Sequence, residues 1–222
     1  ALIKYFSGKK LKKSLRFIFV PETIGSIAYI NRNLKKLKKN VIGGYNLTCI
    51  GDERNHSCML SKFQNSPSDT SLIEAYKKLR IKYKKYSFLD RGSDERQFSS
   101  PGVDLSITSI FRSKYREYPE YHTSLDNFDL VTLQGLKGGY EVAKLSINNL
   151  MQKIIPEPRV MCEPMLSKKK LYKSVSIKNN NKLLSRKLLD FLMYADGKTD
   201  LSRISNIIKV DYSLALKIYD LL

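Results

Sequence analysis

The order of strand-like and helix-like segments constrains the fold of this chain more than any other sequence feature. Four short apolar runs are typical of strands, at residues 15–20, 41–52, 86–90 and 103–111. Helical spacing of apolar residues lies between the first two runs and again before the third. This alternation predicts an α/β domain in which helices flank a largely parallel sheet.

The helices of this part are predicted from apolar spacing and from capping residues. The first follows the strand at 15–20, and its apolar stripe is Ile24, Ile27, Ile30, Leu34 and Leu37. The clearest helix spans residues 67–85, where Pro67 and either Ser68 or Asp69 mark its start. A last helix at 139–154 closes the domain.

Composition and spacing change after the last of these helices. A proline-rich and then lysine-rich stretch begins near residue 156, and from residue 183 onward all apolar spacing is helical. We therefore expect an α/β domain at 1–155, a linker at 156–182, and a small unit of three helices at 183–222. The chain does not begin with Met and opens in what reads as the end of a helix, so we expect a fragment whose N-terminal part is missing.

The formal net charge of +19 raises the question of a nucleic-acid partner. Lys outnumbers Arg by 29 to 11, a ratio that an AT-biased coding sequence also produces, and the last helical pattern carries only Lys217 as a basic residue. A solvated basic surface and a nucleic-acid surface both remain open, with the solvated surface favoured. No apolar run reaches the ~18–20 residues of a membrane span, so we expect no membrane partner.

The three cysteines, Cys49, Cys58 and Cys162, are odd in number and show no CxxC spacing. This pattern favours free thiols over a disulfide framework or a cysteine zinc site. It predicts a reducing compartment, which we interpret as the cytoplasm.

Residues 90–129 hold the most informative polar residues. His122 lies in the run EYHTSLDN, and the acidic pair Asp94 and Glu95 lies upstream in GSDERQF. A neutral imidazole is a common metal ligand and proton carrier, and nearby carboxylates can bind metal or orient the ring. A structural role for His122 is the alternative, and we expect the other histidine, His56, to lie on the surface.

The runs GSDERQF, PG and YHTSLDN together resemble the C-terminal part of the zinc aminopeptidases. They resemble more closely a bacterial group of aminopeptidase-like proteins in which a winged helix follows the peptidase-like domain. The resemblance implies a three-layer α/β fold, a zinc cofactor, a peptide or amide substrate and a C-terminal winged helix-turn-helix domain.

The same resemblance implies roles for individual residues. Glu22, in PETIGSI, matches the general base, and His122 matches a zinc ligand. Site-shaping roles fall to four other residues, namely Asp94, Glu95, Thr123 and Asp126. A carboxylate in the first turn of a helix, which favours the helix dipole, is the alternative for Glu22.

Two positions depart from the family pattern. Thr23 and Thr48 stand where the family has metal-binding carboxylates, and Asp52 is the residue that could substitute for one of them. Two functions therefore stay open. One is metal-dependent hydrolysis of an amide, with Glu22 and His122 facing one cleft. The other is a non-catalytic ligand- or partner-binding module coupled to a winged-helix nucleic-acid-binding domain.

Overall fold

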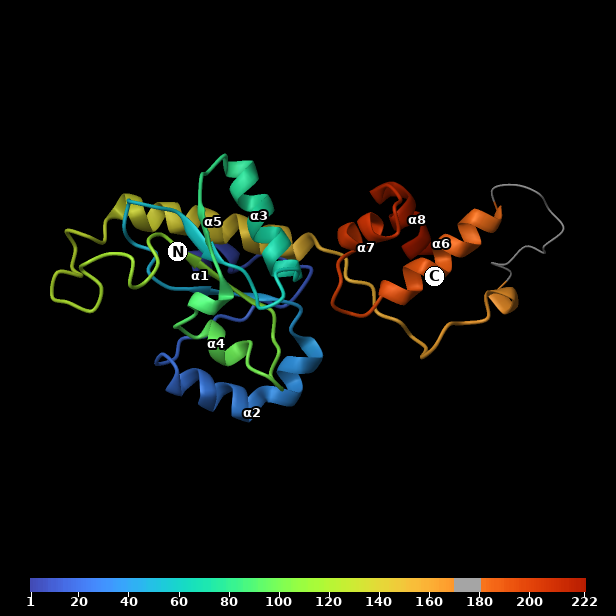
Figure 1. Cartoon of the computed structure of the whole chain (residues 1–222), viewed down its shortest axis with the longest axis horizontal. Coiled ribbons are helices and arrows are strands. Elements are labelled where there is room, and N and C mark those ends of the chain that lie inside the picture. The colour runs from blue at the N-terminus through green and yellow to red at the C-terminus, as the bar shows by residue number, and fades with distance from the viewer. Residues whose placement is uncertain (170–180) are drawn as a thin grey trace. The chain divides into compact units, whose positions relative to one another are not determined.

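The computed structural model describes residues 1–169 and 181–222 of the chain. It divides into two compact units, Ala1–Gln152 and Lys153–Leu222, which are described separately below (Figure 1). Part of the predicted linker at 156–182 falls on residues 170–180, outside the described residues. No helix in the described ranges is both long and apolar enough to cross a membrane.

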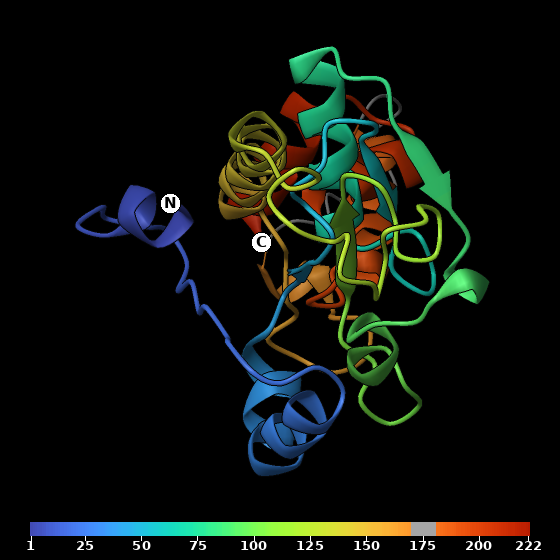
Figure 2. The same ribbon diagram turned by 90° about the vertical axis from the view of Figure 1, so that its left-hand side faces the viewer.

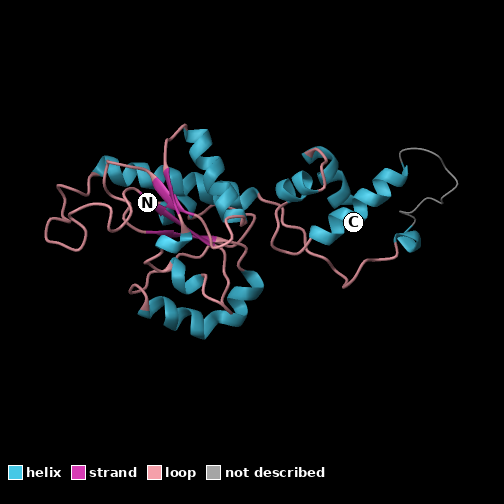
Figure 3. Ribbon diagram, in the orientation of Figure 1, coloured by secondary structure: helices cyan, strands magenta, loops and turns pink. Residues whose placement is uncertain are grey.

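The first unit is a mixed α/β structure (Figure 3). Its four strands are β1 Gly44–Leu47, β2 Ser57–Met59, β3 Lys84–Tyr86 and β4 Ile107–Phe111. Its helices are α1 Leu2–Phe6, α2 Ile24–Asn40, α3 Pro67–Leu79, the 3-10 turn η1 Phe88–Asp90, α4 Glu95–Phe98 and α5 Leu133–Gln152.

The sheet is mixed rather than largely parallel as predicted. The strand order is β1-β4-β2-β3; β1 and β4 run parallel, as do β2 and β3, whereas β2 and β4 run antiparallel. The connection from β1 to β2 comprises only residues 48–56. A parallel crossover needs roughly a dozen residues or more, so β2 turns back and runs against β1 and β4.

The predicted strand at 15–20 joins no sheet. It is an irregular segment between α1 and α2, and it forms no ladder with any strand of the described residues (Figure 2). Leu15 and Phe17 pack against a cluster formed by Phe6, Ile147 and Met151. The apolar pattern therefore reflects side chains that pack against the core, although no neighbouring strand pairs with this segment.

The other three predicted strands are shorter than the apolar runs. The run at 41–52 contains β1, the run at 103–111 contains β4, and the run at 86–90 overlaps only the last residue of β3 before η1 begins. The serine that begins η1 explains this last difference, because the Ser87 side chain accepts a hydrogen bond from Leu89 N and starts a helical turn.

Local chemistry also sets the ends of the helices. The cap of α3 is Ser66, one residue before Pro67, and Ser66 and Asp69 form a reciprocal capping box. The start of α5 is Leu133, six residues before the predicted start at 139. Glycine ordinarily disfavours helix interiors, so the glycines in this stretch give no sequence signal for the helix start. At Gly135, however, an added Cβ would lie 1.9 Å from the Gly51 carbonyl oxygen. Glycine is therefore required for the close approach of α5 to the residues after β1.

The core of the first unit lies between the sheet and the pair α3 and α5, which pack against each other (Figures 1 and 2). Fully buried side chains from β2, α3, β4 and α5 meet there: Cys58, Leu72, Tyr76, Ile110, Val142 and Ala143. Helix α4 contacts β4 and α2. This arrangement fixes the carboxyl ends of β1 and β4, where the candidate site lies.

The second unit is helical, as the apolar spacing predicts. It contains the 3-10 turn η2 Leu166–Lys169 and the helices α6 Asn181–Tyr194, α7 Leu201–Ile207 and α8 Tyr212–Leu221. Asp200 and Asp211 cap α7 and α8 through hydrogen bonds from the backbone N–H groups of Arg203 and Leu214. The core comprises side chains of all three helices, among them Leu188, Phe191, Leu201, Ile204, Ala215 and Ile218.

Candidate functional site at the carboxyl ends of β1 and β4

Two loops meet at the carboxyl edge of the parallel pair β1 and β4. The residues that follow β1 and those that follow β4 are joined by a backbone hydrogen bond from Arg112 N to Cys49 O. A crevice beyond the carboxyl ends of parallel strands is the usual place for a ligand in α/β proteins. The predicted site residues Asp52 and His122 both lie in these loops.

Asp52 is buried and braces the two loops. Its Oδ1 accepts hydrogen bonds from Arg54 N at 2.9 Å and from the Ser113 hydroxyl at 2.8 Å, and its Oδ2 accepts from Ser113 N at 2.7 Å. Its side chain thus ties the loop after β1 to the loop after β4. Both carboxylate oxygens are engaged within the protein.

Glu95 occupies a similar buried position on α4. Its Oε1 accepts from the backbone N–H groups of Gly92 and Ser93 and from the Tyr115 hydroxyl, and its Oε2 accepts from Asn46 Nδ2 and the Ser109 hydroxyl. Burial acts to raise the pKa of Glu95, but these hydrogen bonds outweigh it and hold the pKa below its usual value. Glu95 is therefore an ionised anchor that joins α4 to β1 and β4.

Asp94 holds the turn that carries Glu22. Its Oδ1 accepts a hydrogen bond from Thr23 N at 2.8 Å, and Arg96 Nη2 donates to the Thr23 hydroxyl oxygen at 2.9 Å. Thr23 has a positive φ of 62°, a backbone conformation that a β-branched residue rarely adopts. The Asp94 and Arg96 side chains hold this strained turn in place at the start of α2.

Glu22 is exposed and lies close to the loop that contains His122. The pKa of Tyr121 is raised, first by burial and then by its electrostatic interactions with Cys49 and with the negative charge of Glu22. The ring of Tyr121 stacks on the ring of His122, with centroids 3.9 Å apart. The structure thus places Glu22 within electrostatic range of Tyr121, the residue beside His122. That Glu22 and His122 face one cleft stays a prediction.

His122 itself is exposed and has a positive φ of 59°. Thr123 supports this part of the loop, because its hydroxyl donates to Glu120 O at 2.8 Å and accepts from Leu125 N at 3.2 Å. Asp126 continues the turn through a backbone hydrogen bond from its N–H to Thr123 O. The imidazole is therefore displayed on a folded loop.

A bidentate ion pair fastens this loop to the residues after β1. The two terminal nitrogens of the Arg54 guanidinium donate to the two carboxylate oxygens of Glu120, at 2.8 and 2.6 Å. The guanidinium lowers the pKa of Glu120 to about 2. This geometry is the strong, oriented form of an arginine–carboxylate pair.

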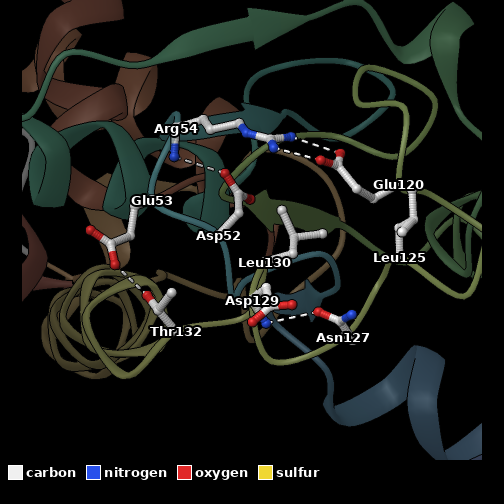
Figure 4. A pocket seen from close by; sticks show the side chains of 9 residues that line it. All are labelled: Asp52, Glu53, Arg54, Glu120, Leu125, Asn127, Asp129, Leu130 and Thr132. Carbon is white, nitrogen blue, oxygen red and sulfur yellow. Dashed lines mark hydrogen bonds and ion pairs between the residues drawn. The ribbon is translucent and has the colours of Figure 1, made fainter.

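An open hollow of about 510 Å³ lies between these loops (Figure 4). It is lined by Asp52, Glu53, Arg54, Glu120, Leu125, Asn127, Asp129, Leu130 and Thr132. Four carboxylates and one guanidinium give the lining a formal charge of −3, on a chain whose net charge is +19. An open, acidic hollow with two leucines is suited to a ligand that carries both positive charge and apolar surface.

The hollow was not anticipated from the sequence, although a signal for it exists. Residues 117–136 contain no Lys or Arg and four acidic residues, in a chain with 40 Lys and Arg. The large excess of Lys and Arg in the whole chain hides this acidic run. The net charge of a window of about 20 residues reveals it.

His56 is half-buried rather than on the surface as predicted. Its ring lies 6.4 Å from that of Tyr76, centroid to centroid, and it forms a hydrogen bond with the Arg112 guanidinium. Burial, followed by the positive charge of Arg112, lowers the pKa of His56 to about 4. An isolated histidine in a turn gives no sequence signal for its contact with Arg112, the buried arginine that follows β4.

The residues present do not fit a zinc site. Among the residues that the structure describes, no group of three or more His, Cys, Asp or Glu side chains could hold a metal ion. The Asp52 and Glu95 carboxylates are engaged by protein donors, and the Thr23 hydroxyl accepts from Arg96. The three cysteines are free, as predicted.

Comparison with known proteins places the chain in a family. Residues 1–153 match the family described as a domain of unknown function, DUF4910, and residues 154–222 match a winged helix-turn-helix family. The chain belongs to the DUF4910 family. The three helices of the second unit agree with the winged helix-turn-helix match.

Relatives of this DUF4910 chain have aminopeptidase-like descriptions. A Clostridium acetobutylicum protein described as a candidate polysaccharide biosynthesis protein with an aminopeptidase-like domain is 34% identical over 207 residues, which cover 92% of this chain and 47% of that protein. A crystal structure of a candidate peptidase from Clostridium acetobutylicum superposes with a TM-score of 0.67 at 32% identity, covering 99% of this chain and 49% of the other. The chain thus spans about half the length of these relatives.

A more distant structure shows the fold. The zinc aminopeptidase BSAP from Bacillus subtilis superposes with a TM-score of 0.58 at 16% identity, over 66% of this chain and 38% of BSAP. The first unit therefore has a mixed α/β fold of the aminopeptidase-like kind, as the sequence resemblance implied.

Proposed function

We propose that the first unit is an aminopeptidase-like module that binds a cationic peptide in the hollow beside residues 120–132. The observation that carries the proposal is the acidic and partly apolar lining of that hollow. The aminopeptidase-like descriptions of its relatives support a peptide as the ligand class.

The carboxylates that line the hollow are of two kinds: some are held by several protein donors, and others are open to a ligand. Asp52 is engaged by three protein donors, and Glu120 is paired with Arg54. Glu53 accepts one hydrogen bond, from the Thr132 hydroxyl, and Asp129 is exposed. Glu53 and Asp129 are therefore the carboxylates that meet the cationic groups of the peptide, and Leu125 and Leu130 meet its apolar groups.

Fluorescence anisotropy with labelled peptides tests this assignment. A short peptide of alternating Lys and Leu should bind, and its counterpart with Glu in place of Lys should not. The double substitution Glu53→Gln and Asp129→Asn should weaken binding of the Lys peptide by roughly tenfold, about 1.4 kcal/mol, since it removes both available charges. More salt should weaken the binding, because exposed charges are screened.

The matched control is the double substitution Glu163→Gln and Asp220→Asn in the second unit. It changes the net charge of the chain by the same amount at two exposed carboxylates. Equal binding of the Lys and Glu peptides, or equal loss in both double variants, would show that the hollow does not select cations.

Metal-dependent amide hydrolysis, with Glu22 as proton acceptor and His122 as a metal ligand, is a second candidate. The effect of Glu22 on Tyr121, which stacks on His122, favours it. Zinc would polarise the substrate carbonyl and activate water in such a reaction. The described residues do not supply a zinc ligand set, so in this chain we derive no step that uses zinc.

Metal analysis separates the two candidates. After dialysis against zinc-free buffer, we expect the chain to retain well under one zinc ion per molecule, and its aminopeptidase activity to stay at background, because too few free ligands meet. Stoichiometric zinc together with activity that Glu22→Gln abolishes without loss of metal would establish hydrolysis instead.

A further inference from the structure

The second half of α2 carries a row of positive charge on one side. Four exposed cations follow one another there and are here called the basic face: Arg32, Lys35, Lys36 and Lys39. Residues three and four apart lie on the same side of a helix, so the basic face extends for about 10 Å along the axis. Ile30 and Leu37 on the other side are 7% and 5% exposed. The protein therefore holds one side of α2 in its core and leaves the charged side in water.

No carboxylate neutralises the basic face. None of its four residues forms an ion pair with any residue that the structure describes. The neighbouring Lys38, by contrast, donates from its ammonium group to Gly102 O at 2.9 Å. Like charges three and four residues apart repel each other and destabilise a helix. Negative charge on a partner would relieve this repulsion.

The charge is also segregated along the sequence. Residues 1–51 hold eleven Lys and Arg and a single acidic residue, Glu22, whereas the other 171 residues hold 29 and 20. A composition rich in Lys adds cations throughout a chain, but it does not remove carboxylates from one stretch. Ammonium and guanidinium groups are almost never fully buried unless they are paired. The basic face is therefore suited to water or to an anionic partner.

The surroundings of the basic face indicate the class of that partner. The apolar side of α2 is buried, so this helix cannot insert an apolar face into a membrane. Residues 30–40 contain no aromatic side chain on which the bases of a single strand could stack. A DNA duplex presents closely and regularly spaced phosphates, which match a row of cations on a helix.

The second unit supports a duplex as the partner. It matches a winged helix-turn-helix family, and helix-turn-helix proteins place a helix in the major groove of DNA. Its last helix, α8, carries Lys217 as its one basic residue. Phosphate contacts from elsewhere in the chain would supply the electrostatic affinity that α8 lacks.

We propose that the basic face of α2 binds the phosphate backbone of double-stranded DNA without selecting a sequence. Each cation contacts phosphate and releases condensed counterions, so the affinity depends on the number of charges and on salt rather than on base order. This site is distinct from the acidic hollow, which attracts cations.

Fluorescence anisotropy with a labelled duplex of about 20 base pairs tests the proposal. The basic-face variant replaces all four cations, by Arg32→Gln, Lys35→Gln, Lys36→Gln and Lys39→Gln. At about 50 mM salt it should bind the duplex at least tenfold more weakly than the unmodified chain, because its phosphate contacts are lost. Each contact contributes about 0.9 to the slope of log affinity against log salt, so the slope should become shallower by about 3–4. A second duplex of unrelated sequence should bind the unmodified chain equally well.

The matched control removes the same charge from four exposed lysines outside α2, by Lys78→Gln, Lys82→Gln, Lys84→Gln and Lys85→Gln. Its affinity for the duplex should stay within about threefold of that of the unmodified chain, because distant charges are screened. Thermal unfolding checks that both variants fold. The basic-face variant should unfold at no lower temperature than the control, since it loses like-charge repulsion.

Three outcomes would overturn the proposal. Equal loss of affinity in the two quadruple variants would assign the binding to net charge, and unchanged affinity in the basic-face variant would assign it to another surface. Absence of duplex binding by the unmodified chain at about 50 mM salt would make the basic face a solvated surface. Poly-glutamate or vesicles of phosphatidylserine that bind the basic face as tightly as the duplex would show that its partner is an acidic polypeptide or a membrane.

Discussion

At the scale of the residue, buried polar side chains in the first unit act as connectors between segments that are distant in sequence. Asp69 accepts hydrogen bonds from Ser61, Ser66 and Thr108, and Glu95 joins α4 to β1 and β4. Charged groups of this kind are tolerated in a core only when donors satisfy them. The sequence singled out Asp69 as a capping residue and Glu95 as a site-shaping residue, but the partners from other elements, Thr108 for Asp69 and Asn46 for Glu95, lie too far along the chain to be read from spacing.

His56 leads to a prediction about pH. Its pKa is lowered from 6.5 to about 4 in the folded chain, so between these values the unfolded chain binds more protons than the folded chain. The contribution of neutral His56 to stability is therefore complete above about pH 6.5 and is lost as the pH falls to about 4. Thermal unfolding curves recorded from pH 4 to 7 measure this effect. The unfolding temperature should fall less steeply with decreasing pH in His56→Gln than in the unmodified chain.

The control for His56 is Gln134→Ala, an exposed substitution that removes no titratable group. This variant should keep the slope of the unmodified chain between pH 4 and 7. An unchanged slope in His56→Gln would show that the contact with Arg112 does not persist in solution.

At the scale of the element, the sequence predicted which helices and strands form better than it predicted which strands pair. Helices α2 and α3, and the three helices of the second unit, follow from apolar spacing, and caps local in sequence begin α3, α7 and α8. Strand pairing depends on neighbours. The run at 15–20 has the residues of a strand but no partner among the described residues, and the short connection after β1 makes the sheet mixed.

The start of α5 gives a prediction at this scale. An alanine ordinarily stabilises a helix interior by about 1 kcal/mol relative to glycine. At Gly135 the added methyl group would overlap the Gly51 carbonyl, and shifting α5 should cost more than that gain, so we expect Gly135→Ala to destabilise the first unit by roughly 1–3 kcal/mol. Calorimetry of the whole chain measures the change as a lower transition temperature.

The neighbouring substitution Gln134→Ala serves as the control, because Gln134 is exposed on the same turn of α5. It should change stability by no more than about 0.5 kcal/mol. A Gly135→Ala variant as stable as this control would mean that α5 does not approach the loop after β1 so closely.

At the scale of the whole molecule, charge is distributed unevenly along the sequence. Residues 1–51 hold eleven basic residues and one acidic residue, whereas residues 117–136 hold four acidic residues and no Lys or Arg. Of the two runs that carry the resemblance, YHTSLDN lies in the loop after β4, whereas GSDERQF ends in α4. The resemblance could not reveal that protein donors engage Asp52 and Glu95. Those contacts depend on Ser113, which follows β4, and on Asn46 and Ser109 in β1 and β4.

The position of β4 in the sheet has a consequence for synthesis on the ribosome. β4 lies between β1 and β2, yet it is the last of the four strands of the first unit along the sequence, and β1 pairs with it in the register Gly44↔Ile107. A nascent chain must therefore expose about 60 residues beyond β1 before the centre of its sheet can form, and contacts of this separation slow folding. Until then β1 and β2 lack their shared neighbour, so we expect the unfinished chain to aggregate more readily than the completed one.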